Sequence, residues 1–600
     1  MKSRDRFAVA ALALMLAVVA AAMYATDALQ SPDLAPIYVT PPPGLIYREG
    51  VVSHPSSINP LTARTQADRD LVALLFRGLL RSGPNGTLVP DLASSWSVSA
   101  DGLTYTFNMR SDALWEDGQP VTAADVVFTV GLAQDPDYDG PLGGSWLGIK
   151  AVAAGTSVVR FTLPTPLGGF ARQALLPILP AHLLTGTAVT DLADSDFSSQ
   201  PVGDGPYRLA SIDGTHALLV RSSPTPAEPP AESPSGSDSG FDSGSASAPA
   251  SASASASASA SASASASAPA SEPPAVPTLA PQGNIDSLEL QFFDDQASAL
   301  ASFRAGKLEA LGGLAPDSIA NAATRAATSV LTYPQASLYS VVLNRRPSHP
   351  EFASLNVRKA LLAAIDRATI LQTALLGRGT VADAPLPSWS ASYDASAISV
   401  TAYSTADATA DLTAAGWVRD PTGWTLPNAK TDYAIKLLTL SEAANPVAYR
   451  VATQVAAAWS AVGVQVSLQT LGAADYTQNL SSGSFDAAVV DYRLGLDPDV
   501  SPLLHSTQAA PAGSNLSAVS DTSLDKLLTA VRTTSDPAAR KTAVSAVEQY
   551  VSTNVLMLPI CFADYEFVVS NRLSAVATNQ VADPSDRFWD VLDWRLASDG

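Results

Sequence analysis

Residues 88–130 read LVPDLASSWSVSADGLTYTFNMRSDALWEDGQPVTAADVVFTV, and this stretch carries the strongest local evidence for the fold of the chain. In its first half, a turn at 100–102 precedes Leu103, Tyr105, Phe107 and Met109, which alternate with polar residues. Alternation of this kind on either side of an Asp-Gly turn is typical of a β-hairpin with one buried face. A second tight turn is expected at Asp117-Gly118.

The second half of the stretch carries a helix start. Thr122 can cap a helix, and Asp125, three residues later, can complete a capping box before the apolar run Val126 to Phe128. Residues 88–130 therefore predict a β-hairpin followed by a capped helix in a mixed α/β domain.

The order and wording of these motifs resemble the signature of the family 5 extracytoplasmic solute-binding proteins, the peptide-binding and nickel-binding components of bacterial ABC importers. Similar wording recurs at Ser56 to Leu61, where the family has an Asn-Pro-Leu turn, and at Pro201 to Leu209, which looks like its Gly-Thr-Gly-Pro-Tyr turn. It recurs again at Asn356 to Arg367. The resemblance implies an α/β fold of two lobes, periplasmic-binding-protein-like (type II), with three discontinuous domains.

By the same resemblance, the chain divides into three interleaved domains. Domain I would comprise 44–88, 200–333 and 550–600, domain II 89–199, and domain III 334–549. Residues 222–283 interrupt domain I with Ser, Ala, Pro and acidic residues. Since few of these side chains are large enough to offset the entropy of ordering, we expect a disordered insert.

Composition narrows the classes of function. Six hundred residues exceed one hydrophobic core, and the net charge of −21 argues against nucleic acid, whose phosphates would be repelled. Cys561 is the single cysteine, so no disulfide can form within the chain, and its apolar surroundings in the sequence are typical of an inert core residue. We expect a monomer.

The N-terminus predicts export. Lys2, Arg4 and Arg6 precede an apolar run from Phe7 to Ala25, which is long enough to nearly cross a bilayer as a helix. Residues 1–25 are therefore a signal peptide or a retained membrane anchor, and we favour the anchor. Residues 26–43 are rich in proline and are expected to form a linker.

Further elements are expected along the chain. We predict a strand at 50–53, a helix reaching from Asp70 to Leu79, one continuous helix over Asn356 to Arg367, and a parallel βαβ unit over 433–468. Strands are also predicted at Val555 to Val569 and Val591 to Arg595. Gly203 and Gly205 permit positive φ in the turn at 201–209.

The ligand contacts are inferred partly from the resemblance. Peptide-binding relatives hold the peptide amine with an Asp in a Gly-Trp-x-x-Asp stretch. The matching run here is Asp491-Tyr492-Arg493-Leu494-Gly495, so Gly495 falls where that Asp would be. Asp491 or Asp497 could replace it, and Arg493 could instead attract an anion. The full set of predicted ligand contacts is Ser56, Ser57, Leu343, Asn344, Trp389, Asp491, Tyr492, Arg493 and Asp497.

No catalytic or metal-binding motif is found in the sequence. The five histidines lack metal-ligand spacing, and no nucleophile elbow, phosphate loop or dinucleotide fingerprint is present, so neither an enzyme nor a cofactor is expected. The resemblance implies an importer component that binds oligopeptides in a cleft between lobes and presents them to a membrane permease. Alternatives are the same fold with a nickel chelate, an oligosaccharide or another small solute, or a surface sensor or adhesion protein.

Overall fold

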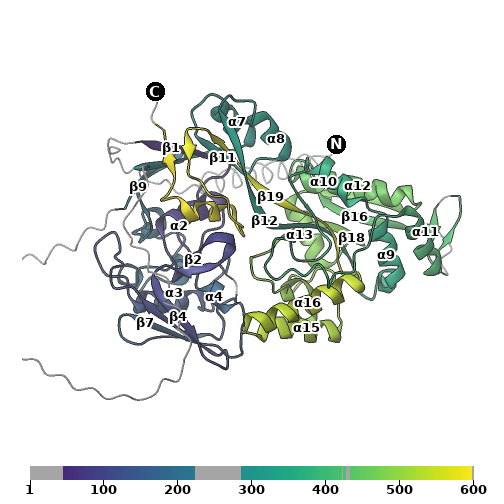
Figure 1. The fold of residues 1–600 in the computed structure, drawn as a ribbon, viewed down its shortest axis with the longest axis horizontal. Helices are drawn as coiled ribbons and strands as arrows, with labels where there is room; N and C mark the ends of the chain where they lie inside the picture. The colour runs from purple at the N-terminus through teal and green to yellow at the C-terminus, as the bar shows by residue number, and fades with distance from the viewer. Residues whose placement is uncertain (1–44, 143, 223–284, 422, 428–432, 598–600) are drawn as a thin grey trace, which may run out of the picture.

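The computed structural model describes residues 45–142, 144–222, 285–421, 423–427 and 433–597. Within them an 11-stranded sheet runs through the whole molecule in the order β17-β16-β18-β12-β19-β11-β1-β10-β9-β8, with β13 pairing beside β19 (Figure 1). Its strands are β1 (Ile46–Val51), β8 (Tyr207–Ile212), β9 (His216–Arg221), β10 (Ser287–Phe292), β11 (Ala310–Gly312), β12 (Thr328–Leu343), β13 (Gly379–Val381), β16 (Ala434–Leu440), β17 (Gln465–Leu471), β18 (Ala487–Arg493) and β19 (Leu558–Ser570).

The two long strands β12 and β19 join the two halves of the molecule. Residues 328–333 of β12 pair with 565–570, and residues 337–341 pair with 558–563. Between these two stretches the register shifts, so 334–336 form an irregularity at the middle of the sheet. We call the part with residues 45–333 and 565–597 lobe 1, and the part with residues 337–563 lobe 2. Figure 1 shows them on either side of β12 and β19.

Lobe 1 combines one end of the large sheet with a second, four-stranded sheet. In the large sheet β1 lies between β10 and β11, parallel to both. The second sheet has the order β4-β5-β7-β6, and α3 packs against its strands β6 and β7. The remaining elements here are α2 (Gln66–Leu75), β2 (Leu80–Ser82), β3 (Leu88–Pro90), β4 (Ala93–Val98), β5 (Thr104–Met109), α3 (Ala123–Ala133), β6 (Lys150–Ala153), β7 (Val158–Thr162), α4 (Phe170–Gln173), α5 (Ala181–Leu184), α6 (Asp196–Ser199), α7 (Gln296–Arg304), α8 (Pro316–Ala322), β20 (Leu573–Ser574), β21 (Arg595–Leu596) and the 3-10 helices η1 (Pro84–Gly86), η2 (Val189–Asp191) and η5 (Pro584–Asp590).

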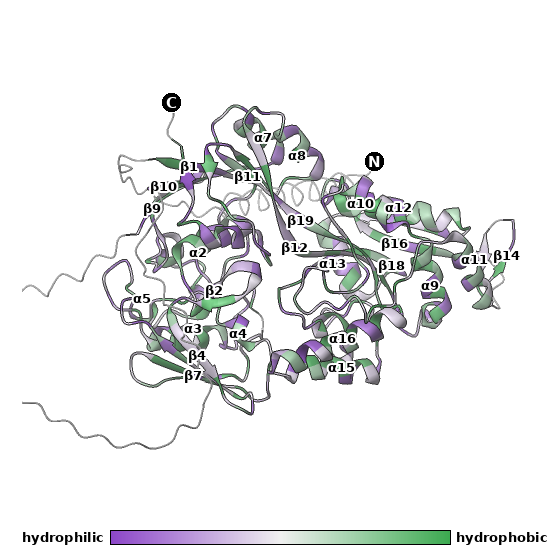
Figure 2. Ribbon diagram, in the orientation of Figure 1, coloured by the Kyte–Doolittle hydropathy of each residue, from purple (hydrophilic) through white to green (hydrophobic). Residues whose placement is uncertain are grey.

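Lobe 2 is built around the other end of the large sheet. β16 and β17 are parallel, and α12 connects them as the crossover helix of a βαβ unit. Its helices are α9 (Leu355–Ala363), α10 (Arg367–Ala374), α11 (Thr405–Ala414), α12 (Pro446–Ala461), α13 (Ala473–Ser482), α14 (Ser501–Leu504), α15 (Thr522–Thr533) and α16 (Pro537–Thr553), with the 3-10 helices η3 (Pro350–Ala353) and η4 (Ser506–Gln508). Figure 2 shows hydrophilic and hydrophobic residues interspersed along α15 and α16, and α15 buries Leu524, Leu528 and Val531. Separate cores fill the two lobes.

Local signals predicted most elements correctly. β4 and β5 form the hairpin, and α3 begins after Thr122. The βαβ unit at 433–468 is confirmed, with Asn445 capping α12. Cys561 is fully buried, as expected. The mixed α/β architecture is that of the predicted fold class.

Four element predictions were wrong in detail. The first strand spans 46–51 instead of 50–53, and the first helix ends at Leu75 because Phe76 adopts an extended conformation. The helix predicted over 356–367 is two helices, since Asp366 caps α10 by accepting the Thr369 N–H at 3.0 Å. Near the C-terminus the strand is only Arg595–Leu596.

The glycines of the turn at 201–209 are needed for a reason other than positive φ. Neither Gly203 nor Gly205 has positive φ. A Cβ atom at Gly203 would instead lie 2.1 Å from the Leu75 carbonyl oxygen, and one at Gly205 would lie 2.5 Å from the Leu74 carbonyl oxygen. These positions need glycine because the backbone packs closely on the end of α2.

The predictions for 1–25, 26–43 and most of 222–283 lie outside the described residues. Among the residues that are described, no helix is both long and apolar enough to span a membrane.

Candidate functional site

The two lobes touch each other away from the shared strands. Just before α4 in the sequence, the Gly168 N–H of lobe 1 donates to the Arg532 carbonyl of lobe 2 at 2.7 Å. A second contact joins Gln580, whose side chain donates to the Trp389 carbonyl at 3.3 Å. A third is the ion pair between Asp317 on α8 and Arg450 on α12. The residues at these contacts define the boundary between the lobes, which is the candidate site.

Asp497 lies at this boundary and is held by an arginine. Arg540 on α16 donates to both of its carboxylate oxygens, at 2.9 and 2.6 Å. The Asp499 N–H also donates to the Asp497 carboxylate, at 2.9 Å. On the other side of the boundary, Gly169 packs so closely that an added Cβ would lie 2.4 Å from Asp497 Oδ2. Asp497 therefore takes part in a contact between the lobes.

Asp491 and Arg493 lie near each other at the end of β18. Asp491 accepts the Ser337 hydroxyl at 2.7 Å and pairs with Arg493 Nε at 3.2 Å. Arg493 also donates to the Gln335 side chain at 3.3 Å, and its own side chain is 59% exposed. Gln335 belongs to the irregularity of β12, so this group of side chains sits where the lobes join.

Tyr492 and Trp389 are the two aromatic residues of the predicted set. Tyr492 packs against the apolar residues under α13 and under α15 and α16, and burial raises the pKa of its phenol. Trp389 is half-buried, in a loop whose backbone receives the hydrogen bond from Gln580 of lobe 1. Both residues lie in lobe 2, and the backbone of the Trp389 loop contacts lobe 1.

Four predicted contacts are occupied by bonds within a lobe. Ser56 and Ser57 both donate their backbone N–H to the Asp68 carboxylate, at 2.6 and 3.0 Å, and the Ser56 hydroxyl donates to it at 2.8 Å. Asn344 is fully buried and donates its amide to the Gly483 and Phe485 carbonyls, while Leu343 is a core residue of lobe 2. The structure does not bring these four together with the residues around Asp497.

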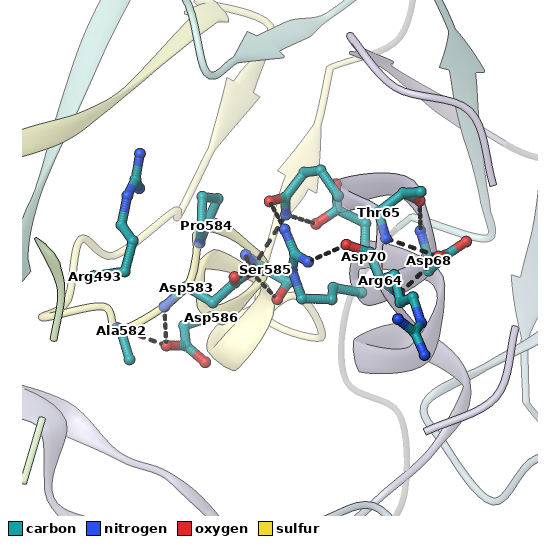
Figure 3. A network of polar contacts seen from close by, with 12 residues as sticks. Arg64, Thr65, Asp68, Asp70, Arg493, Ala582, Asp583, Pro584, Ser585 and Asp586 are labelled. Atoms are coloured by element: carbon teal, nitrogen blue, oxygen red, sulfur yellow. Dashed lines mark hydrogen bonds and ion pairs between the residues drawn. The ribbon is translucent and has the colours of Figure 1, made fainter. Parts of the chain in front are cut away.

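Asp68 belongs to a larger polar network that the sequence analysis missed (Figure 3). The figure shows Asp68 and Asp70 on α2 beside Asp583, which caps η5, and Ser585 and Asp586 of η5. At its centre, the buried Arg587 pairs with Glu49 at 2.6 Å and with Asp70 at 2.8 Å. Burial raises the pKa of Glu49, although Arg587 acts against the shift. Because Glu49 and Arg587 are 538 positions apart, no local pattern could reveal the pair.

Arg172 is a second residue that the sequence analysis missed. It lies on α4 of lobe 1, donates to the Gly86 carbonyl at 2.8 Å and is half-buried. Burial lowers the pKa of its guanidinium, and Asp497 of lobe 2 acts in the opposite direction. An arginine in a short helix carries no sequence signal for this placement.

The side chains at this boundary are of kinds that bind solutes. Among the described residues, no group of three or more His, Cys, Asp or Glu side chains could hold a metal ion. The Cys561 thiol is buried in lobe 2, and burial raises its pKa to about 12. Paired charges and two aromatic side chains are groups suited to holding a solute.

Two α/β lobes that share two long strands and meet at a polar boundary define a hinged, two-lobed binding protein. The family model described as "Bacterial extracellular solute-binding proteins, family 5 Middle" matches residues 87–225 and 279–514. The chain belongs to this family, as the resemblance predicted.

Relatives and solved structures agree with this assignment. Protein XP55 of Streptomyces lividans is 24% identical over 538 residues, covering 88% of this chain and 85% of that protein. Oligopeptide-binding protein AppA of Bacillus subtilis is 23% identical over 496 residues, covering 81% of this chain and 80% of that protein. The crystal structure of AppA from Bacillus subtilis with a nonapeptide has a TM-score of 0.68 at 20% identity and covers 93% of this chain and all of that chain. NikZ from Campylobacter jejuni with Ni(L-His) has a TM-score of 0.69 at 21% identity and covers 92% and 99%.

Proposed function

We propose that this protein is the extracytoplasmic substrate-binding component of an ABC importer, and that it binds oligopeptides between its lobes and presents them to a membrane permease. The observation that carries the proposal is the pair of shared strands, β12 and β19, with lobes that touch on either side of them. A solute that contacts both lobes stabilises the closed form, and the permease recognises that form. The protein acts as a monomer without chemical change of the solute.

Peptide is the proposed solute because relatives that match over most of this chain are named for oligopeptide binding. Trp389 and Tyr492 are proposed to contact its side chains, because both are aromatic residues of lobe 2 and the Trp389 loop contacts lobe 1. Leu494 follows β18 and donates its backbone N–H to Ala336, so the strand continues toward the boundary.

A specific observation favours a second candidate, a small acidic solute. Asp491 is engaged by Arg493, and Asp497 by Arg540, so neither carboxylate is positioned to receive a peptide amine alone. The exposed guanidinium of Arg493 would attract a carboxylate instead. A relative of the same fold, AgaA, is solved in complex with agropinic acid.

The test is mass spectrometry of small molecules that are released when the exported full chain is purified and denatured. Recovered short peptides support the proposal, whereas a recovered organic acid, sugar or metal chelate supports another solute. Trp389→Ala is expected to retain at most about a tenth of the solute, if the ring supplies a stacking or apolar contact of ordinary strength. Trp589→Ala is the matched control, because Trp589 contacts the lobe 1 carbonyl of Ala577.

We also propose that residues 7–25 are not cleaved and anchor the protein in the cytoplasmic membrane, with the rest of the chain on its outer side. Sequencing the N-terminus of the membrane-extracted protein tests this. A chain that begins near Met23 would exclude the anchor.

A further inference from the structure

We propose that Gly168 and Gly169 of lobe 1, together with Asp497 and Arg540 of lobe 2, form a latch that holds the lobes closed. The inference rests on the proposed function, since it assigns to these residues the control of lobe closure and therefore of solute affinity. It also gives Asp497 a role other than contact with the solute.

The two glycines are required by the contact and not by their own backbone. Neither has positive φ, and Gly169 has φ −88° and ψ 1°, which other residues also adopt. An added Cβ at Gly168, however, would lie 2.1 Å from the Thr534 carbonyl oxygen, and one at Gly169 would lie 2.4 Å from Asp497 Oδ2. The three nearest atoms at each position belong to lobe 2, so a side chain there conflicts first with the contact between the lobes.

The lobe 2 face of the latch is rigid, so it cannot move aside for a side chain. Arg540 donates its Nε to the Val531 carbonyl at 3.0 Å and its two terminal nitrogens to Asp497. Arg532 on α15 pairs with Asp499 at 3.2 Å. These bonds tie α15, α16 and the loop after β18 into one unit. That unit positions the Arg532 carbonyl to accept the Gly168 N–H at 2.7 Å.

Charge adds attraction across the same boundary. Arg172 lies three residues after Gly169, and Asp497 is the leading charged group that acts on it from lobe 2. Arg540 is also close enough to act on Arg172, and it repels it. The bidentate pairing of Arg540 with Asp497 therefore serves to neutralise Arg540 as well as to fix the loop. When the lobes separate, the Gly168 hydrogen bond and this attraction are both lost.

The consequence is that the latch sets how much of the protein is closed at equilibrium. Apparent solute affinity falls in proportion to the fraction of molecules that can close. Gly169→Val should raise the apparent Kd of any solute that needs both lobes by at least about tenfold. Gly214→Val is the matched control, because Gly214 also lacks positive φ and an added Cβ there meets no atom within 4 Å.

The experiment measures the distance between lobes in the full chain by electron spin resonance. Spin labels are placed on Thr190→Cys in lobe 1 and Lys526→Cys in lobe 2, and the buried Cys561 is left in place. The probe is a defined mixture of synthetic nonapeptides, added after a measurement in its absence. We expect a short-distance population in the parent protein and in Gly214→Val, and its loss in Gly169→Val.

Every outcome decides the question. Retention of the short-distance population in Gly169→Val overturns the latch, and so does its absence from the parent protein with and without the probe. If the probe changes no distance while Gly169→Val still abolishes the short one, the peptide proposal fails and the latch stands. Should Gly169→Val fail to fold, Arg172→Met replaces it and is expected to reduce the short-distance population without affecting the Arg540 pair.

Discussion

At the scale of single residues, Arg587 is the cation on which the buried polar groups of lobe 1 converge. It bridges Glu49 on β1 and Asp70 on α2, and it lies over the Phe588 ring at 4.0 Å. Replacing it with Met would leave two buried carboxylates without their partner. We expect Arg587→Met to destabilise the protein by about 3–5 kcal/mol. Urea denaturation measures this, and Arg304→Met, on the exposed side of α7, should change stability by less than about 0.5 kcal/mol.

A second residue makes stability depend on pH. Glu548 on α16 is 1% exposed and accepts the Asp394 N–H with one oxygen, while its other oxygen lacks a hydrogen-bond partner in the described structure. Burial raises its pKa to about 7 from 4.5. The folded protein therefore keeps the proton that the unfolded chain releases. Stability from this group is complete below pH 4.5 and declines as the pH rises to about 7.

The shift corresponds to at most about 3.5 kcal/mol of unfolding free energy between those pH values. Glu548→Gln cannot ionise, so this part of the pH dependence should disappear while the rest remains. Urea denaturation of both proteins at several pH values provides the comparison. If the free energy of unfolding changes equally with pH in the two proteins between pH 5 and 7, Glu548 ionises normally in the folded state.

At the scale of elements, the start of α3 connects a predicted motif to tertiary structure. Asp125 accepts the Thr122 N–H at 2.8 Å, as the capping box requires, and its other oxygen accepts the Ala181 N–H at 2.9 Å. Asp125→Ala removes both bonds from a buried position. We expect a loss of about 2–3 kcal/mol, more than a cap alone supplies. Asp137→Ala, at an exposed carboxylate after the same helix, is the control, and an equal loss there would contradict this account.

The elements show which predictions a sequence can support. The hairpin at 93–109 and the helix α3 were predicted because their turn and cap residues are neighbours in the chain. The helix at 356–367 was predicted as continuous because its apolar spacing persists through Ile365, whereas the cap formed by Asp366 restarts the helix.

The candidate site was harder to predict because its contacts join residues that are far apart in the chain. Asp497 was predicted as one of two carboxylates that could hold a peptide amine, but its partner Arg540 is 43 positions away. The opposing Gly169 lies in the other lobe, with no local signal for this contact. A sequence without an alignment identifies polar residues near a strand end, and only the folded chain shows which of them already have partners.

At the scale of the whole molecule, we expect that the protein folds without residues 223–284, which connect β9 to β10. The two strands are antiparallel neighbours, and the Arg221 N–H donates to the Asp286 carbonyl at 3.0 Å. A tight turn can therefore replace the segment. Shortening a loop of roughly 60 residues to about 4 is nearly four doublings, which should stabilise the protein by about 2 kcal/mol. Thermal unfolding and solute binding of the deletion variant check this, and insoluble protein would contradict it.

The interleaving of the lobes also governs when this chain can fold. β1 lies between β10 and β11, and its Glu49 finds Arg587 only near the far end of the chain. Contacts of such long sequence separation form slowly, because closing the chain costs entropy before any core is gained. A nascent chain therefore cannot complete lobe 1 until almost all of it has been synthesised. Lobe 1 therefore remains incomplete through most of synthesis, and an incomplete lobe presents less folded structure to a translocation channel.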